Sequence, residues 1–154
     1  MTADSFFSRL NPVLVGLLRS PLHFLASAGL MLVTVTGRHS GRRYTIPVGY
    51  QRDGEVVTVM VSEARSKQWW RNYSEPGPVT LRIRGREVHG TAHVVSPESE
   101  EFRDAAEQTL RRMPWLGRVF HVDYDRAAGL GDEQVAQLGD EIAVVRISLE
   151  GEDA

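Results

Sequence analysis

The sequence predicts a mainly β domain: a small antiparallel β-barrel of about six strands with peripheral helices. Along residues 79–84, valine, leucine and isoleucine alternate with threonine and arginine, which is the period-two pattern of a half-buried strand. Asp53-Gly54 and Arg84-Gly85 each lie between two strand-like runs and are typical of hairpin turns. Helical patterns occur only at the ends and in one crossover, which disfavours a doubly wound sheet.

The strands are expected in six apolar runs rich in β-branched residues. These runs cover residues 30–36, 43–50, 55–62, 78–84, 87–95 and 141–149. The segment from Gln51 to Gly54 is expected to be the turn between the second and third strands. Since the chain has 154 residues, 42% of them hydrophobic, and no repeat or linker, it is expected to form a single domain over residues 1–154.

Helices are expected around and between these strands. A short one is expected over residues 66–74. A longer one is expected to open at Ser96-Pro97 and run to about Arg112, with three glutamates in its first turn, where the helix dipole favours acidic side chains. Residues 113–131 are expected to be irregular, and Asp132 is expected to cap a last short helix. The regions are thus N-terminal helices over 1–29, barrel core over 30–95, helical crossover over 96–140 and final strand over 141–149.

Two short helices, over residues 12–19 and 21–28, are expected near the N-terminus, because Asn11-Pro12 and Ser20-Pro21 each place a capping residue before a proline. No apolar run reaches ~20 residues, so a spanning helix is not expected, and no signal-peptide pattern is present. The helices either cover one end of the core or form an interfacial face that contacts membrane or holds a lipid-like substrate. That face would comprise Phe6, Phe7, Leu14, Leu17, Leu18 and Phe24.

Charge and cysteine content narrow the function. Residues 1–95 carry twelve Lys/Arg and six Asp/Glu, whereas residues 96–154 carry six and fourteen. The basic half is consistent with an anionic ligand, but no lysine-rich run or recognition motif points to nucleic acid. With no cysteine, the chain has no disulfide, no Cys-ligated zinc and no thiol nucleophile, and it fits a reducing, cytoplasmic environment.

The loop at residues 37–44 is the most informative segment. It lies between two strand-like runs and contains two glycines, which allow a tight turn, and Ser40, which adds a hydroxyl. Guanidinium groups and unpaired backbone N–H groups suit a phosphate or a carboxylate. We therefore interpret Arg38, Arg42 and Arg43 as part of an anion-binding loop, although a solvated loop with no ligand would have the same composition. His39 adds charge only when protonated.

A second constellation lies at residues 66–73. Asn72 is three residues from Trp69, so both lie on one helical face, which either presents an aromatic wall and an amide to a planar heterocycle or packs in the core. Ser62 ends an apolar strand and offers a hydroxyl. His89 and His93 have metal-like spacing but no accompanying carboxylate motif, so no metal site is expected. Because no hydrolase elbow or Gly-x-Gly-x-x-Gly motif is present, any chemistry is expected to come from a bound cofactor.

Thr36-Gly-Arg-His-Ser-Gly-Arg-Arg-Tyr-Thr-Ile-Pro47, Asp53-Gly54, the valine-rich run to Ser62 and Trp69-Trp-Arg-Asn72 together resemble the deazaflavin-dependent nitroreductase family. The resemblance covers roughly residues 30–95. It implies a split β-barrel, like that of FMN-binding proteins, and an enzyme that uses reduced coenzyme F420. His39, where family members often have Lys or Arg, and the short segment from Ser62 to Trp69 depart from the family pattern.

The resemblance also implies the roles of site residues. The loop would hold the phosphate and oligoglutamate tail of the cofactor, and the strand positions with Trp69 and Asn72 would surround its ring. The cofactor-binding set is then Arg38, His39, Ser40, Gly41, Arg42, Arg43, Tyr44, Pro47, Val48, Val61, Ser62, Trp69 and Asn72. Ser62 would also orient the reacting ring, and Tyr50 or Tyr124 is the expected proton donor.

The expected function is transfer of a hydride from F420H2 to an electron-poor small molecule, such as a quinone, an enone or a nitroaromatic. Two alternatives stay open: a non-catalytic binder or carrier of F420 or of an anionic lipid, and a relative that uses FMN. The sequence leaves open a homodimer and a peripheral membrane contact through the N-terminal helices.

Overall fold

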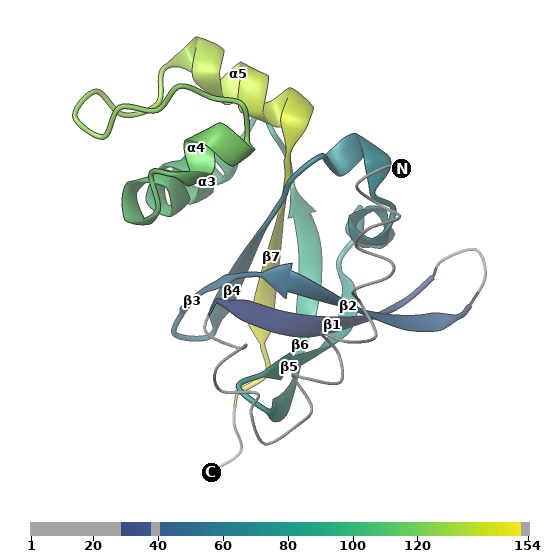
Figure 1. Cartoon of the computed structure of the whole chain (residues 1–154). Helices are drawn as coiled ribbons and strands as arrows, with labels where there is room; N and C mark the ends of the chain where they lie inside the picture. Colours follow the sequence, from purple (N-terminus) through teal and green to yellow (C-terminus); the bar gives the residue numbers. More distant parts are fainter. Residues whose placement is uncertain (1–28, 38–40, 152–154) are drawn as a thin grey trace.

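The computed structural model describes residues 29–37 and 41–151 (Figure 1). The expected N-terminal helices and their apolar face lie outside the described residues, as do Arg38, His39 and Ser40 of the loop. Among the described residues, no helix is both long enough and apolar enough to cross a membrane.

The described chain forms one seven-stranded sheet, in which all neighbouring strands run antiparallel. The order across the sheet is β2-β1-β5-β6-β7-β4-β3. The strands are β1 (Leu30–Thr36), β2 (Arg43–Gly49), β3 (Gln51–Asp53), β4 (Val56–Val61), β5 (Gly77–Ile83), β6 (Arg86–Val95) and β7 (Ala143–Leu149).

The two edge strands of the sheet are consecutive in the sequence. Only Tyr50 separates β2 at one edge from β3 at the other, so the sheet must curl until its two edges lie near each other. The prediction of an antiparallel barrel is therefore confirmed. The number of strands was underestimated, because Gln51–Asp53, expected to be part of a turn, pairs with β4 as a short strand.

Two hydrophobic clusters lie on opposite faces of the sheet. The barrel core collects the inward residues of all strands except β3, together with Trp69 and Tyr73. A second cluster lies outside the barrel, where Met60, Val95 and Val144 point outward and meet three helices, α3 (Glu100–Arg112), α4 (Leu116–Val119) and α5 (Asp132–Glu141). These helices gather over one end of the barrel, and we call them the helical layer (Figure 1).

Several expected element boundaries were wrong for local reasons. The α3 helix begins at Glu100 and not at Ser96-Pro97, because the Ser99 hydroxyl accepts the Phe102 N–H at 3.2 Å and acts as the N-cap. Asp132 is the first residue of α5, and Gly131 is its N-cap. The Gly131 N–H donates to the side-chain oxygen of Gln134 at 2.8 Å.

Two other segments also differ from the expected helices. Where one short helix was expected over residues 66–74, the structure has the last residue of one 3₁₀ helix, η1 (Ala64–Ser66), and then a second, η2 (Trp69–Tyr73). The segment after α3, expected to be irregular, contains α4.

Candidate functional site

The strand register gathers most of the predicted site at one end of the barrel. β5 begins opposite the end of β1, since Thr34 pairs with Thr80 and Leu32 with Arg82, so η2, just before β5, lies at the same end as the β1–β2 loop. The end of β4 pairs with the start of β7, as Val61 with Ala143, and the start of β7 adjoins the end of β6. Ser62 therefore belongs to this end too.

The β1–β2 loop is a tight turn in its described part. The Gly41 N–H donates to the Gly37 carbonyl and the Gly37 N–H donates to the Arg42 carbonyl, both at 2.9 Å. Gly41 has φ +69°, which glycine adopts without strain, and no atom lies within 4 Å of the position a Cβ would take. The turn thus presents an open stretch of backbone beside Arg42 and Arg43, both exposed.

Tyr44 and Asn72 connect β2 to η2. The Asn72 side-chain nitrogen donates to the Tyr44 hydroxyl at 3.3 Å and to the Trp69 carbonyl at 2.9 Å. Trp69 is 6% exposed and belongs to the barrel core, whereas Tyr44 is 37% exposed. Tyr44, Trp69 and Asn72, which the sequence predicted as parts of one site, are therefore linked in the structure.

Ser62 is half-buried at the end of β4, and Lys67 lies beside it. The Lys67 ammonium donates to the Ser62 hydroxyl oxygen at 3.3 Å. An ammonium group only donates hydrogen bonds, so this contact uses a lone pair of the serine oxygen and leaves its O–H proton for another acceptor. Lys67, which follows the 3₁₀ helix Ala64–Ser66, was not among the predicted site residues, and no pattern in the sequence indicates that its side chain reaches back to Ser62.

Tyr73 follows Asn72 and turns into the barrel core. Its hydroxyl donates to the Pro78 carbonyl at 3.2 Å, and its side chain is 3% exposed. Burial, with a smaller contribution from Tyr44, raises the pKa of Tyr73 to about 12. Tyr73 thus stays protonated at neutral pH. Its buried ring holds η2, which carries Asn72, against the barrel core.

The remaining predicted strand positions divide between the two faces of the sheet. Val61 points into the core, and Val48 packs against it. Pro47 pairs with Leu32, which lies outside the barrel core, so its ring points to the opposite face from Val48. Pro47 and Val48 can therefore flank one ligand only through their backbone.

The two tyrosines expected as proton donors lie away from this cluster. β2 separates Tyr50 from Arg43 by roughly 20 Å, at about 3.3 Å per residue. Tyr124 packs in the helical layer, where its Cβ lies 3.5 Å from the position a Cβ on Gly117 would take. Its hydroxyl is buried near Glu107, and burial first, then the Glu107 carboxylate, raises the pKa of Tyr124.

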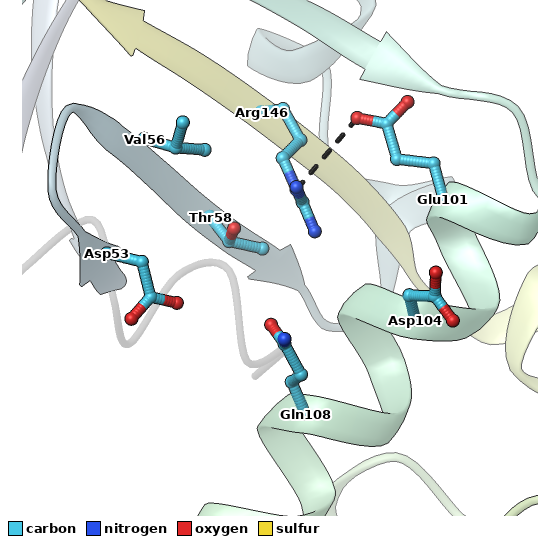
Figure 2. A pocket seen from close by; sticks show the side chains of 7 residues that line it. All are labelled: Asp53, Val56, Thr58, Glu101, Asp104, Gln108 and Arg146. Atoms are coloured by element: carbon cyan, nitrogen blue, oxygen red, sulfur yellow. Dashed lines mark ion pairs between the residues drawn. The ribbon is translucent and has the colours of Figure 1, made fainter.

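A separate cavity of about 480 Å³ lies between the outer face of the barrel and α3 (Figure 2). Arg146 extends into it, with its Nε 4.0 Å from Glu101 and without a hydrogen bond in the described structure. Three carboxylates and one guanidinium line the cavity, so its net charge opposes a polyanionic ligand. The lining residues are Asp53, Val56, Thr58, Glu101, Asp104, Gln108 and Arg146, none of them a predicted site residue.

Within the described ranges, no group of three or more His, Asp or Glu side chains is arranged to hold a metal ion. His89 lies 3.2 Å from the Thr80 hydroxyl and His93 lies 3.6 Å from a Glu101 oxygen, so each of the two histidines has its own partner.

Comparison with known proteins gives a family match over the part of the chain that contains the candidate cofactor-binding residues. A family model described as F420H(2)-dependent quinone reductase matches residues 21–114, more than half of the chain. The matched range includes every predicted cofactor-binding residue, and Tyr50, but not Tyr124. No curated protein matches the chain significantly.

Solved structures share the fold at low sequence identity. An F420-H2 dependent reductase, FDR-A, is 17% identical, with a TM-score of 0.54 over 79% of this chain and 95% of that one. A protein described as a domain-swapped dimer is 16% identical, with a TM-score of 0.54 over 79% and 81%. The heme storage protein HutZ from Vibrio cholerae is 14% identical, with a TM-score of 0.50 over 84% and 87%.

Proposed function

Because the chain belongs to the family of F420H2-dependent quinone reductases, we propose that it reduces a quinone at the end of the barrel formed by the β1–β2 loop, η2 and Ser62. The chain is an F420H2-dependent oxidoreductase, and its cofactor is coenzyme F420. The observation that carries the location is the hydrogen bond from Asn72 to Tyr44, which joins the two sequence segments that the resemblance assigns to the cofactor.

The residues at this end fit the chemistry of F420. Its tail is polyanionic, and the turn offers open backbone at Gly41 beside two exposed arginines. Its ring is a planar heterocycle with polar edges, and the half-buried Ser62 and Asn72 supply a hydroxyl and an amide in a partly apolar setting. Bound F420H2 supplies the hydride, and a quinone must also gain a proton to become a hydroquinone.

The protein's own part in this reaction is positioning. The Lys67 ammonium donates a hydrogen bond to the Ser62 oxygen. The Ser62 O–H can therefore donate its own hydrogen bond to a carbonyl oxygen of the ring or of the acceptor. Asn72 fixes the Tyr44 hydroxyl at the edge of the cluster. Because Tyr44 is exposed there, whereas Tyr50 and Tyr124 lie elsewhere, we favour Tyr44 as the proton donor to the acceptor.

Titration of the purified protein with F420 and, separately, with FMN tests the cofactor assignment. We expect saturable F420 binding at micromolar concentration, weaker FMN binding, and oxidation of F420H2 when a quinone is added. Binding without turnover across quinones, enones and nitroaromatics would favour a carrier instead. Tight binding of FMN alone would favour a flavin enzyme.

A pair of double variants tests the location. Arg42→Ala with Arg43→Ala should weaken F420 binding by a few kcal/mol if both make charge-assisted bonds, and should reduce its salt dependence. Arg84→Ala with Arg86→Ala removes the same charge from the β5–β6 hairpin, which the register places at the other end of β1. Equal losses in both variants would show that the β1–β2 loop is not the tail site.

Assembly and membrane contact are further parts of the proposal. The likeness to a solved domain-swapped dimer supports a homodimer, which light scattering of the purified protein would test. Contact of the N-terminal apolar residues with membrane stays a prediction, and truncation before Gly29 followed by a vesicle-binding assay would test it.

A further inference from the structure

The turn after β4 contains a strained residue directly beside Ser62. Glu63 has φ +49° and ψ +48°, the left-handed conformation, which costs free energy in a residue other than glycine. Its side chain does not cap η1, and within the described ranges it forms no ion pair and no side-chain hydrogen bond. The strain is therefore not explained by a contact of the glutamate, and backbone strain of this kind is most common where it positions functional groups.

The chain turns at Glu63, and this turn brings Lys67 back to Ser62. The carbonyl of the buried Ala64 accepts the Lys67 backbone N–H at 3.1 Å and the indole N–H of Trp70 at 2.9 Å. These two bonds fix the backbone of Lys67 against the wall of the barrel end. From there its ammonium reaches the Ser62 hydroxyl oxygen at 3.3 Å.

Lys67 supplies the positive charge at Ser62. Arg65, the other cation of this turn, lies 3.7 Å from Asp140, and the two side chains are 82% and 78% exposed, so solvent screens both charges. Lys67 is half-buried, so its charge acts where less water surrounds it. The cation that can act on the Ser62 hydroxyl is therefore Lys67.

We propose that Lys67 polarises the Ser62 hydroxyl, so that Ser62 binds the oxygen of the acceptor that becomes negative during reduction. A hydroxyl whose oxygen accepts a hydrogen bond from a cation donates its own hydrogen bond more strongly. A preorganised donor of this kind stabilises an oxyanion more than it stabilises a neutral carbonyl, which lowers the barrier. Ser62 is then a catalytic residue, whereas Lys67, which acts through Ser62, and Glu63 are positioning residues.

This inference rests on the proposed function and gives Ser62 and Tyr44 different tasks in it. The quinone accepts a hydride, with its electron pair, from F420H2, so the quinone is reduced and F420H2 is oxidised. The negative charge then lies on a quinone oxygen, where Ser62 stabilises it until a proton from Tyr44 completes the hydroquinone. Tyr44 recovers a proton from solvent, and solvent receives the proton that F420H2 releases besides its hydride, so atoms and charge balance.

A phenol bound in place of the acceptor tests the inference without turnover. The full-length protein is saturated with oxidised F420 and titrated with para-fluorophenol at several pH values, and the fluorine chemical shift reports the ionised fraction of the bound phenol. We expect the phenolate to bind about tenfold more tightly than the neutral phenol, because a nearby positive charge favours the charged form. Lys67→Met should abolish this preference, and Lys67→Arg should retain most of it.

Arg65→Met is the matched control, because it removes a positive charge from the same turn and should leave the phenolate preference intact. Ser62→Ala should abolish the preference, since Lys67 acts through the serine hydroxyl. The inference is overturned if Lys67→Met or Ser62→Ala keeps the preference, or if a protein that reduces quinones binds no phenol. It is also overturned if Lys67→Met mainly weakens F420 binding, which would make Lys67 a cofactor ligand. Failure of the unchanged protein to bind F420 would instead contradict the proposed function, before any phenol is added.

Discussion

The side-chain nitrogen of Asn72 donates to two acceptors, and one of them, the Tyr44 hydroxyl, is 28 residues away in sequence. The bond to the Trp69 carbonyl is local and holds the side chain against η2. The bond to Tyr44 is the one that ties η2 to the strand after the anion-binding loop. The position of the loop relative to Ser62 thus depends in part on a single amide.

A double-mutant cycle on Asn72→Ala and Tyr44→Phe measures this tie. We expect a coupling free energy of about 0.5–1 kcal/mol in F420 binding, at the weak end for a hydrogen bond because the distance is long. Isothermal titration of the two single variants and the double variant gives the value. Strictly additive losses would mean that each side chain contacts the cofactor independently.

Tyr73 predicts a pH dependence of stability. Its pKa is about 12 in the folded chain against the ordinary tyrosine value of 10.0, so between these values the unfolded chain loses the proton while the native chain keeps it. The stabilisation is therefore complete below pH 10 and lost as pH rises toward 12, by up to about 2–3 kcal/mol. Urea unfolding of Tyr73→Phe at several alkaline pH values should show a shallower decline. The same slope in both proteins would contradict the assignment.

At the scale of elements, Ser99 and Ser96 offer a matched pair. Both precede α3, but only the Ser99 hydroxyl accepts a backbone N–H of the first turn. Ser99→Ala should lower the free energy of unfolding by about 1 kcal/mol, as loss of an N-cap does, while Ser96→Ala should change it little. Thermal unfolding compares the two, and a larger loss in Ser96→Ala would restore the sequence-based boundary.

This pair also shows where the sequence misleads. Proline favours the first helical position, so Ser96-Pro97 was the stronger signal for the start of the helix. The helix begins after Ser99 instead, because the Ser99 hydroxyl accepts the Phe102 N–H. Alternation predicted β5 closely, because Val79, Leu81 and Ile83 are buried in the barrel core and alternate with polar residues. β3 was missed because its residues, Gln51–Asp53, are polar, and only its pairing with β4 makes it a strand.

The same reasoning applies to the candidate site. The loop glycines, Trp69 and Asn72 could be predicted as candidates, because glycine allows a tight turn and a tryptophan and an amide three residues apart share one helical face. Lys67 could not, since nothing in the sequence indicates that its ammonium reaches back to Ser62.

The pairing of β6 with β7 depends on Gly90. A Cβ there would lie 2.6 Å from the Ser148 carbonyl oxygen and 3.0 Å from an Ile147 methyl group, so the strands would have to separate. Gly90→Ala should cost about 1–3 kcal/mol. At Gly49, in β2, the nearest atom is 3.6 Å away, so Gly49→Ala is the control that should be tolerated. Equal denaturation midpoints for the two variants would contradict the close packing.

For the whole molecule, the arrangement of the two clusters matters more than the size of either. β6 and β7 send neighbouring residues to opposite sides: Val94 and Val145 contact the barrel core, whereas Val95 and Val144 contact the helical layer. The barrel core contains no residue of α3, α4 or α5. Within the described chain, these three helices pack on one another and on Met60, Val95 and Val144 of the sheet. The helical layer therefore depends on the sheet for its packing, whereas the barrel core does not include the helical layer.

That one-way dependence implies a hierarchy of partial unfolding. The helical layer can detach as a cooperative unit while the barrel persists, but the barrel cannot open and leave the helices folded. In native-state hydrogen exchange at low denaturant, the amides of α3 and α5 should exchange through a smaller opening free energy than those of β1 and β5. A single shared opening event for both groups would mean that the two clusters form one foldon.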